Sequence, residues 1–357
     1  MAFNPRLITQ PHSPQEEATM KNQQFLDVIY THTEGEPTCI VHAGIPYPYG
    51  SNILSKRAYL KEHHDHVRTS LMREPRGHQH MFGVFLTPPS DEHHDAGMLW
   101  MDGEQFVDMC GHGTIALSMA MVSHRLAPPA QEDGMTRIRF ETTAGTVVSE
   151  VKADADKVHW TRFENVPAFV MEQDIPVDVP GLGTLKADLV FGGNFFAIIR
   201  IPSDKQPICP ENGSYFSMAG EAVKAELNKR MTIRHPVHAH INGLNFVTFW
   251  HGGTQPDSLY RNVHVFSGGK LDRSPGGTGT SAMMAMFHAR NELEENKEIY
   301  SEGLLGSGRF TGKILGKTEI GGYSAIRPSV QGTAELIGYA KWLIDERDPV
   351  GRGFMIG

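Results

Sequence analysis

Cysteine is scarce in this sequence, and its scarcity excludes a fold that depends on disulfides. Only three of the 357 residues are cysteines, and Cys39, Cys110 and Cys209 are widely spaced. Small secreted domains held together by disulfides carry an even and much denser set. We therefore expect free thiols and a reducing, cytoplasmic location.

Long apolar runs and excess positive charge are also missing. No stretch approaches the roughly 18 to 20 apolar residues that a membrane-spanning helix requires, and the N-terminal segment lacks the apolar core of a signal peptide. The formal net charge of −8 gives no electrostatic reason to bind nucleic acid or an anionic membrane. We expect a polar, weakly ordered leader over residues 1–24, and neither nucleic acid nor membrane as a partner.

The remaining composition is that of an ordinary globular α/β protein. Hydrophobic residues make up 39% and charged residues 21% of a chain long enough for one large domain or two modest ones. From residue 25 onward, short segments rich in β-branched and aromatic residues predict strands. These segments are residues 25–33, 81–89, 138–151, 189–201, 245–253 and 261–266.

Two kinds of helix are expected between the strands. Within residues 55–72, and again around residues 216–227, apolar residues recur on one helical face, which indicates helices at the surface of a larger core. Residues 114–122 and 281–287 are instead apolar on nearly every side, which is typical of buried helices.

The two predicted buried helices are preceded by similar glycine-rich turns. The heptapeptide CGHGTIA begins at Cys110, and GGTGTSA begins at Gly276, about half the chain later. Such an echo suggests a duplicated unit. We expect an N-terminal lobe over residues 25–188 and a C-terminal lobe over residues 189–357, whose last strand could return to the first lobe.

Both turns have features of a binding site. The first amide N–H groups of a helix have no partner within the helix, and together with the helix dipole they favour an anion such as a carboxylate. A cysteine just before a helix, as predicted for Cys110, is expected to have a lowered pKa and to serve as a base. The alternative is that Cys110 is a small buried residue and that the glycines only permit a tight turn.

Longer motifs resemble those of the proline racemase family. MCGHGTIA at residues 109–116 is similar to the first active-site motif of that family, and DRSPGGTGTSA at residues 272–282 is similar to the second, which usually reads DRSPCGTGTSA. Further matches extend the resemblance over nearly the whole chain from about residue 25. They are HTEGEP, EPRGH, FGGNFFAI and the C-terminal run from GRFTGKILG to QGTAELIG.

The resemblance implies a fold, an activity and a set of site residues. The fold would have two similar α/β lobes of the diaminopimelate epimerase type, each a β-rich layer around a buried helix, with the active site in the cleft. Cys110 would be the base, and amides of Gly111, Gly277 and Thr278 would bind the substrate carboxylate. His112 and Asp272 would contact the substrate, and the Asp272 carboxylate would bind the ammonium group of the substrate ring. The alternative is a structural role for both residues, in which His112 is a buried histidine whose hydrogen bonds are satisfied and Asp272 caps a turn.

The chain departs from the family pattern at Gly276, which stands in place of the second active-site cysteine. Family racemases use two thiols on opposite faces of the substrate, and glycine cannot transfer a proton. The ordinary two-thiol inversion is then unavailable unless water or a neighbour such as Ser274 substitutes. The family also includes trans-3-hydroxy-L-proline dehydratases, which lack one thiol and often carry threonine there.

A single base suits the dehydratase reaction. In a trans-3-hydroxyproline the hydroxyl and the α-hydrogen lie on the same face, so one base can remove the proton and then protonate the leaving hydroxyl. Our hypothesis is dehydration of trans-3-hydroxy-L-proline to Δ1-pyrroline-2-carboxylate by Cys110. The alternatives are a proline racemase or 4-hydroxyproline 2-epimerase in which water or another residue replaces the second thiol, and an inactive proline-binding protein.

Hypotheses that involve a metal or a pyridoxal cofactor have less support in the sequence. Three histidine-rich segments, at residues 63–66, 78–80 and 92–95, offer metal-ligand types but no recognised metal-binding spacing. No lysine stands out as a pyridoxal-binding residue. We expect no cofactor, no metal and a small proline-type amino acid as the partner, and the sequence leaves open whether the chain forms a homodimer.

Overall fold

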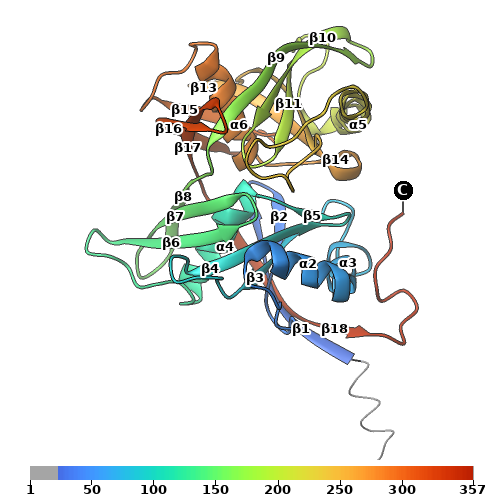
Figure 1. Ribbon diagram of the computed structural model, residues 1–357, viewed down its shortest axis with the longest axis vertical. Helices are drawn as coiled ribbons and strands as arrows, with labels where there is room; N and C mark the ends of the chain where they lie inside the picture. Colours follow the sequence, from blue (N-terminus) through green and yellow to red (C-terminus); the bar gives the residue numbers. More distant parts are fainter. Residues whose placement is uncertain (1–22, 357) are drawn as a thin grey trace, which may run out of the picture.

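The chain folds into two lobes, one above the other in Figure 1, whose strands belong to one hydrogen-bonded network. The computed structural model describes residues 23–356. The leader expected over residues 1–24 therefore lies outside the described residues, except for Gln23 and Gln24, which begin the first strand. In the described part of the chain, no helix is long and apolar enough to cross a membrane.

The first lobe is built mainly from the first half of the chain. Its strands are β1 (Gln23–Thr33), β2 (Glu36–Ala43), β3 (Phe82–Thr87), β4 (Ala96–Asp102), β5 (Phe106–Val107), β6 (Met135–Thr142), β7 (Gly145–Ala153) and β8 (Val158–Glu164). One more strand comes from the far end of the chain, because β18 (Glu335–Asp345) pairs antiparallel with β1. Strands close to both ends of the chain therefore lie side by side in the first lobe.

The second lobe contains the other strands of residues 23–356. They are β9 (Ala168–Val179), β10 (Gly183–Phe191), β11 (Phe195–Arg200), β12 (Phe246–Gly252), β13 (Ser258–Phe266), β14 (Lys270–Leu271), β15 (Glu298–Glu302), β16 (Arg309–Ile320) and β17 (Tyr323–Gly332). The lobes are joined through β17, which pairs antiparallel with β8 and with β9.

Three helices cover the outside of the lobes: α2 (Ile53–His63), α3 (Asp65–Met72) and α5 (Gly213–Arg230). The residues expected to face inward are buried, among them Leu60, Val67 and Phe216. The continuous helix suggested by residues 55–72 is wrong in one respect. His64 leaves helical geometry, with φ −136°, and separates α2 from α3.

The two remaining α-helices of residues 23–356, α4 (Gly111–Ser123) and α6 (Gly277–Ala289), form the centres of the two lobes. Each is buried over its first eleven residues, as their uniformly apolar sequences predicted. Several strands pack against each of these helices, and the helices also contact each other, so no polar face is needed.

The strands around α4 and α6 are paired in the same way. In the first lobe β2 runs parallel to β3, β3 and β5 run antiparallel to β4, and β6 runs parallel to β4. In the second lobe β11, β12, β13, β14 and β15 repeat this order of parallel and antiparallel pairs. This repetition confirms the expected fold of two similar α/β lobes, each a β-rich layer around a buried helix.

Candidate active site

The two central helices meet at their N-termini, where the first glycine of each contacts the other. A Cβ atom on Gly111 would lie 2.4 Å from the Cα of Gly277, and a Cβ on Gly277 would lie 2.6 Å from the Cα of Gly111. Carbon atoms do not approach so closely without bonding, so only glycine permits this contact. The two turns singled out in the sequence therefore form one site between the lobes.

Four buried amides at this contact have no partner. The N–H groups of Gly111, His112, Gly277 and Thr278 donate no hydrogen bond to any other group in residues 23–356. Buried amides without a partner are costly, and here the positive ends of two helix dipoles add to them. The arrangement is suited to a carboxylate held from both lobes.

Cys110 is the residue that precedes α4, and it caps the helix with its sulfur. The Gly113 N–H donates to Sγ over 3.3 Å. The expectation that the helix N-terminus lowers the pKa of this thiol is nevertheless wrong for the structure as a whole. Burial raises the pKa of Cys110 well above its ordinary value, and the nearby Asp272 and Glu36 carboxyls raise it further. The bond from Gly113 opposes these effects but is outweighed.

His112 lies between the thiol and a carboxyl group. Its Nδ1 is 3.4 Å from the sulfur of Cys110 and 3.9 Å from Oδ2 of Asp272. The ring is buried against the edge of Phe82, and burial lowers the pKa of His112 to about 3. The imidazole is therefore neutral near pH 7 and lies within hydrogen-bonding distance of the thiol, whereas Asp272 is too far away for a direct hydrogen bond.

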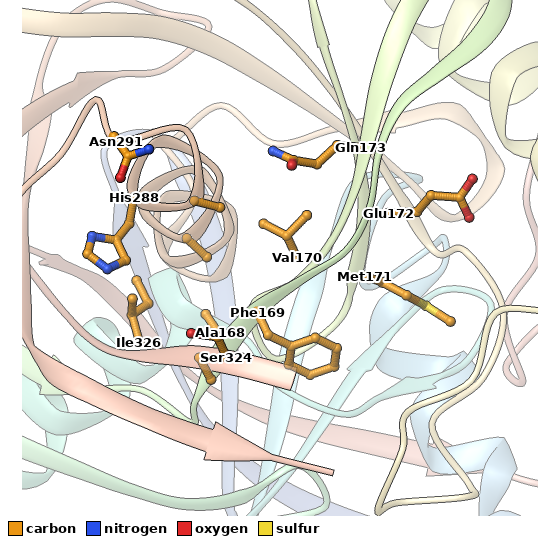
Figure 2. Close-up of a pocket in the computed structure, with 13 residues that line it drawn as sticks. Ala168, Phe169, Val170, Met171, Glu172, Gln173, His288, Asn291, Ser324 and Ile326 are labelled. Atoms are coloured by element: carbon orange, nitrogen blue, oxygen red, sulfur yellow. The ribbon is translucent and has the colours of Figure 1, made fainter. Parts of the chain in front are cut away.

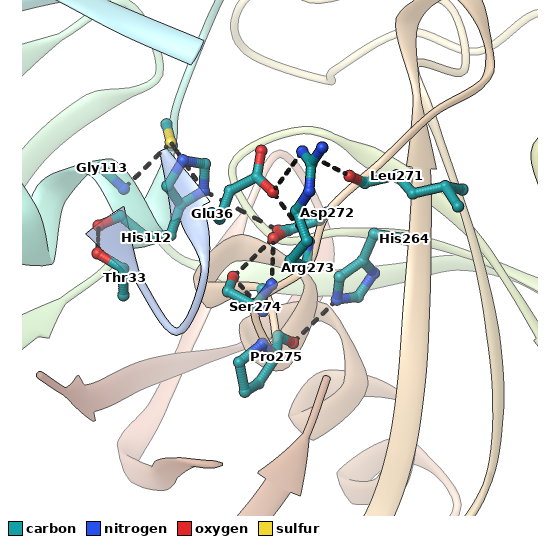
Figure 3. A network of polar contacts seen from close by, with 12 residues as sticks. Thr33, Glu36, His112, Gly113, His264, Leu271, Asp272, Arg273, Ser274 and Pro275 are labelled. Atoms are coloured by element: carbon teal, nitrogen blue, oxygen red, sulfur yellow. Dashed lines mark hydrogen bonds and ion pairs between the residues drawn. The ribbon is translucent and has the colours of Figure 1, made fainter. Parts of the chain in front are cut away.

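Asp272 uses one oxygen for structure and keeps the other toward the site (Figure 3). Oδ1 accepts hydrogen bonds from the backbone N–H and the hydroxyl of Ser274, at 2.8 and 2.7 Å. The turn-capping role considered from the sequence is therefore real, but it leaves Oδ2 directed at His112. Burial raises the pKa of Asp272 to about 6.

Glu36 and Arg273 belong to the same network and received no role in the sequence analysis, although both lie in quoted motifs. Oε2 of the fully buried Glu36 accepts from the Arg273 backbone N–H at 2.9 Å and from its Nη1 at 3.2 Å. Among the described residues, Oε1 has no hydrogen-bond partner. Burial, with a smaller contribution from Asp272, raises the pKa of Glu36. The available signal was that both are charged residues within motifs of the family resemblance.

Gly276 begins the second turn in a conformation that favours glycine, with φ +75°. Ser274, suggested as a substitute for the missing thiol, is engaged on both sides. Its hydroxyl donates to Asp272 and accepts from the Gly276 N–H. The place of the missing side chain is taken instead by His264, on β13, which the sequence analysis did not single out.

The other candidate groups do not converge. In residues 23–356, no cluster of three or more His, Cys, Asp or Glu side chains is arranged to hold a metal ion. Cys39 is buried in β2 and Cys209 precedes a short 3-10 helix of the second lobe. Cys110, unlike Cys39 and Cys209, lies at the contact between the N-termini of α4 and α6.

A separate cavity of about 500 Å³ opens in the second lobe (Figure 2). It lies between β9, β17 and the C-terminal end of α6, and its lining includes Phe169, His288 and Asn291. None of the residues singled out in the sequence lines it. The candidate site is thus the contact between the two helix N-termini.

Comparison with known proteins finds matches over almost the full length of the chain. The family model described as proline racemase matches residues 28–355. A 4-hydroxyproline 2-epimerase from Cereibacter sphaeroides is 58% identical over 337 residues, which cover 94% of this chain and all of the relative. A trans-3-hydroxy-L-proline dehydratase from Bacillus cereus is 34% identical over 338 residues, covering 95% of this chain and all of the relative.

Solved structures share this architecture over nearly the whole chain. A hydroxyproline epimerase from Agrobacterium vitis, crystallised with bound trans-4-hydroxy-L-proline, superimposes with a TM-score of 0.87. Its sequence is 28% identical, and the match covers 93% of this chain and 95% of that one. The two-lobed fold is therefore shared over nearly the full length.

Proposed function

The chain belongs to the proline racemase family, and on that premise we propose that it is a 4-hydroxyproline 2-epimerase, which inverts the α-carbon of 4-hydroxyproline without a cofactor. The observation that carries the proposal is the 58% identity, over 94% of this chain, to a relative with that activity. The hydroxyproline epimerase of similar fold supports the same substrate class.

The dehydratase hypothesis drawn from Gly276 is not favoured. The relative with trans-3-hydroxy-L-proline dehydratase activity is only 34% identical, far below the 58% of the epimerase. The hypothesis assumed that the second acid must come from position 276 itself. A side chain from another strand can reach the same space, which the sequence did not reveal.

The site supplies the groups that inversion requires on one side of the substrate. The four free amides would hold the carboxylate and stabilise the negative charge that develops on it when the α-proton leaves. Oδ2 of Asp272 and the unpaired Oε1 of Glu36 would attract the ring ammonium. Cys110 would act at the α-carbon as the base.

The substrate itself would help to activate Cys110. The thiol has a raised pKa because it is buried and because two carboxyl groups lie nearby. An ammonium ion beside Asp272 and Glu36 offsets their negative charge, which favours the thiolate. Deprotonation of Cys110 is then linked to binding of an amino acid rather than of a simple carboxylic acid.

Incubation of the purified protein with trans-4-hydroxy-L-proline in D2O tests the proposal. We expect inversion at the α-carbon, which chiral chromatography detects, with deuterium incorporation at the same carbon, which NMR detects. L-Proline and trans-3-hydroxy-L-proline are assayed in parallel. Imine formation from the 3-hydroxy compound without inversion of the 4-hydroxy compound would instead establish a dehydratase, and binding without turnover would establish a binding protein.

A further inference from the structure

The imidazole of His264 occupies the space that a side chain at position 276 would need. A Cβ atom built on Gly276 would lie 2.2 Å from both Cδ2 and Nε2 of His264. A Cβ on Gly279 would lie 2.1 Å from Cε1 and 2.3 Å from Nε2 of the same ring. The ring therefore fills the space beside both glycines at the start of α6.

The equivalent place in the first lobe holds both an aromatic ring and the thiol. Gly113 and Gly279 occupy the same position in the two glycine-rich turns. A Cβ built on Gly113 would lie 2.4 Å from the ring of Trp100, on β4, and 2.9 Å from the sulfur of Cys110. In the second lobe, where the thiol is missing, the His264 ring on the equivalent strand β13 fills the space beside both glycines.

The polar contacts of His264 fit a group that gains and loses a proton. Nε2 lies 3.0 Å from the Pro275 carbonyl, which can only accept, and Nδ1 lies 2.7 Å from the Thr248 hydroxyl (Figure 3 shows the first contact). A hydroxyl can donate or accept, so Thr248 can pair with Nδ1 whether or not that nitrogen carries a proton. The ring is 1% exposed and is packed edge-on against Phe196.

We propose that His264 replaces the second thiol, acting as the acid and base on the face of the α-carbon opposite Cys110. This inference rests on the proposed epimerase function. It makes the catalytic pair a thiol from α4 and an imidazole from β13, rather than two thiols at the starts of two helices.

In one direction the Cys110 thiolate removes the α-proton, so the C–H bond breaks, an S–H bond forms, and the electron pair stays on the α-carbon and its carboxylate. The His264 imidazolium then gives its Nε2 proton, which leaves its hydrogen bond with the Pro275 carbonyl, to the opposite face of the α-carbon, and the remaining Nδ1–H donates a hydrogen bond to the Thr248 hydroxyl. In the other direction the neutral imidazole removes the proton and the thiol returns one. No further reactant is consumed.

In the protein without substrate, burial favours the neutral form of both groups. Burial lowers the pKa of His264 to about 4 and raises that of Cys110, so both are neutral together at rest. Moving one proton between them creates a thiolate and an imidazolium with no change in net charge. The two forms of the pair accept the two epimers of the substrate.

The test compares His264→Gln with His251→Gln, measuring kcat and KM for 4-hydroxyproline inversion. His251 is a matched control because it is buried on the adjoining strand β12 and its ring bonds to the backbone of Ile208 and Gly252. We expect His264→Gln to lower kcat by about 10² to 10⁴. Binding of pyrrole-2-carboxylate, a planar mimic of the carbanion, should be preserved, and His251→Gln should keep wild-type kcat.

Each result decides the question. Wild-type kcat in His264→Gln, or loss of pyrrole-2-carboxylate binding in parallel with activity, would overturn the role of His264 while leaving the epimerase function intact. A wild-type protein that inverts no proline-type amino acid would overturn the proposed function and the inference with it. Should His264→Gln fail to fold, Thr248→Val carries the test. The loss of the Nδ1 partner should lower kcat about tenfold or more without raising KM, and an unchanged kcat would overturn the inference.

Discussion

The sulfur of Cys110 lies 3.4 Å from Nδ1 of His112, so a thiol and an imidazole from the same helix start are close enough to share a proton. Burial pushes both toward their neutral forms, because it raises the pKa of the thiol and lowers that of His112 to about 3. Their proximity alone therefore does not produce a thiolate. The charge that does so has to arrive with the ligand.

Cys110→Ser should abolish most of the activity. A serine hydroxyl is a much weaker acid than a thiol, so it supplies almost no base at neutral pH, and kcat should fall by at least about 10²-fold. The measurement is the rate of 4-hydroxyproline inversion. Cys209→Ala is the control, because Cys209 is half-buried and lies outside the contact between the helices. Equal losses in both variants would contradict the assignment of Cys110.

Amino acid binding should strengthen as the pH rises through about 6. Burial raises the pKa of Asp272 from 3.8 to about 6, so the carboxyl is neutral below this pH and charged above it. L-Proline carries a positive ring nitrogen throughout this range and should bind the charged form more tightly. Calorimetry on Cys110→Ala measures the binding without turnover.

Two comparisons isolate the cause of that pH dependence. Pyrrole-2-carboxylate has no positive charge on its ring nitrogen, so its affinity should not rise over the same range. Asp272→Asn should remove the dependence for proline, since an amide does not titrate. Equal pH dependence for both ligands would show that another group is responsible.

Gly111→Ala should push the two helix N-termini apart. The added methyl would lie 2.4 Å from the Cα of Gly277, and such overpacking costs about 1 to 3 kcal/mol of unfolding free energy. Carboxylate binding should be lost as well, because two of the four amides would move. Denaturant unfolding and calorimetry measure the two effects. Gly338→Ala in β18, where an added methyl meets nothing within 4 Å, should leave both unchanged.

Gly276→Cys should not create a working two-thiol site by itself. The new Cβ would collide with the ring of His264, and the φ of +75° is strained for any L side chain, at a cost of roughly 1 to 2 kcal/mol. We expect lower stability and lower epimerase activity than in the wild type. Removing the ring in Gly276→Cys/His264→Ala should recover part of the stability, which thermal unfolding would detect. A fully active and stable Gly276→Cys would contradict the placement of His264.

The part of the site that could be predicted is the part written in consecutive residues. Cys110, Gly111, Gly276 and Gly277 stand at two similar turns, and the uniformly apolar segments after them predicted α4 and α6 with their burial. Local patterns carry this information because a helix and its cap are set by neighbours in the chain.

The remainder depends on contacts between distant segments. His264 lies in the segment RNVHVF, which predicted a strand but gave no sign of a functional residue. Its ring lies beside Gly276 only because β13 packs against the start of α6. The raised pKa of Cys110 is also a tertiary property, because burial and the carboxyls of Glu36 and Asp272 outweigh the helix N-terminus. The sequence motif predicts the helix, which lowers the pKa of the thiol, but not the surrounding groups, which raise it.

The contact of Gly111 with Gly277 also has a consequence for how the lobes hold together. Each helix N-terminus carries roughly half a positive charge, and this contact forces two such ends against one another in a buried place. Two like charges repel, so the junction stores unfavourable energy that a bound carboxylate relieves. Ligand binding then stabilises the contact between the two lobes. A carboxylate at a hundred times its dissociation constant should add about 2.7 kcal/mol to the resistance of the fold against unfolding.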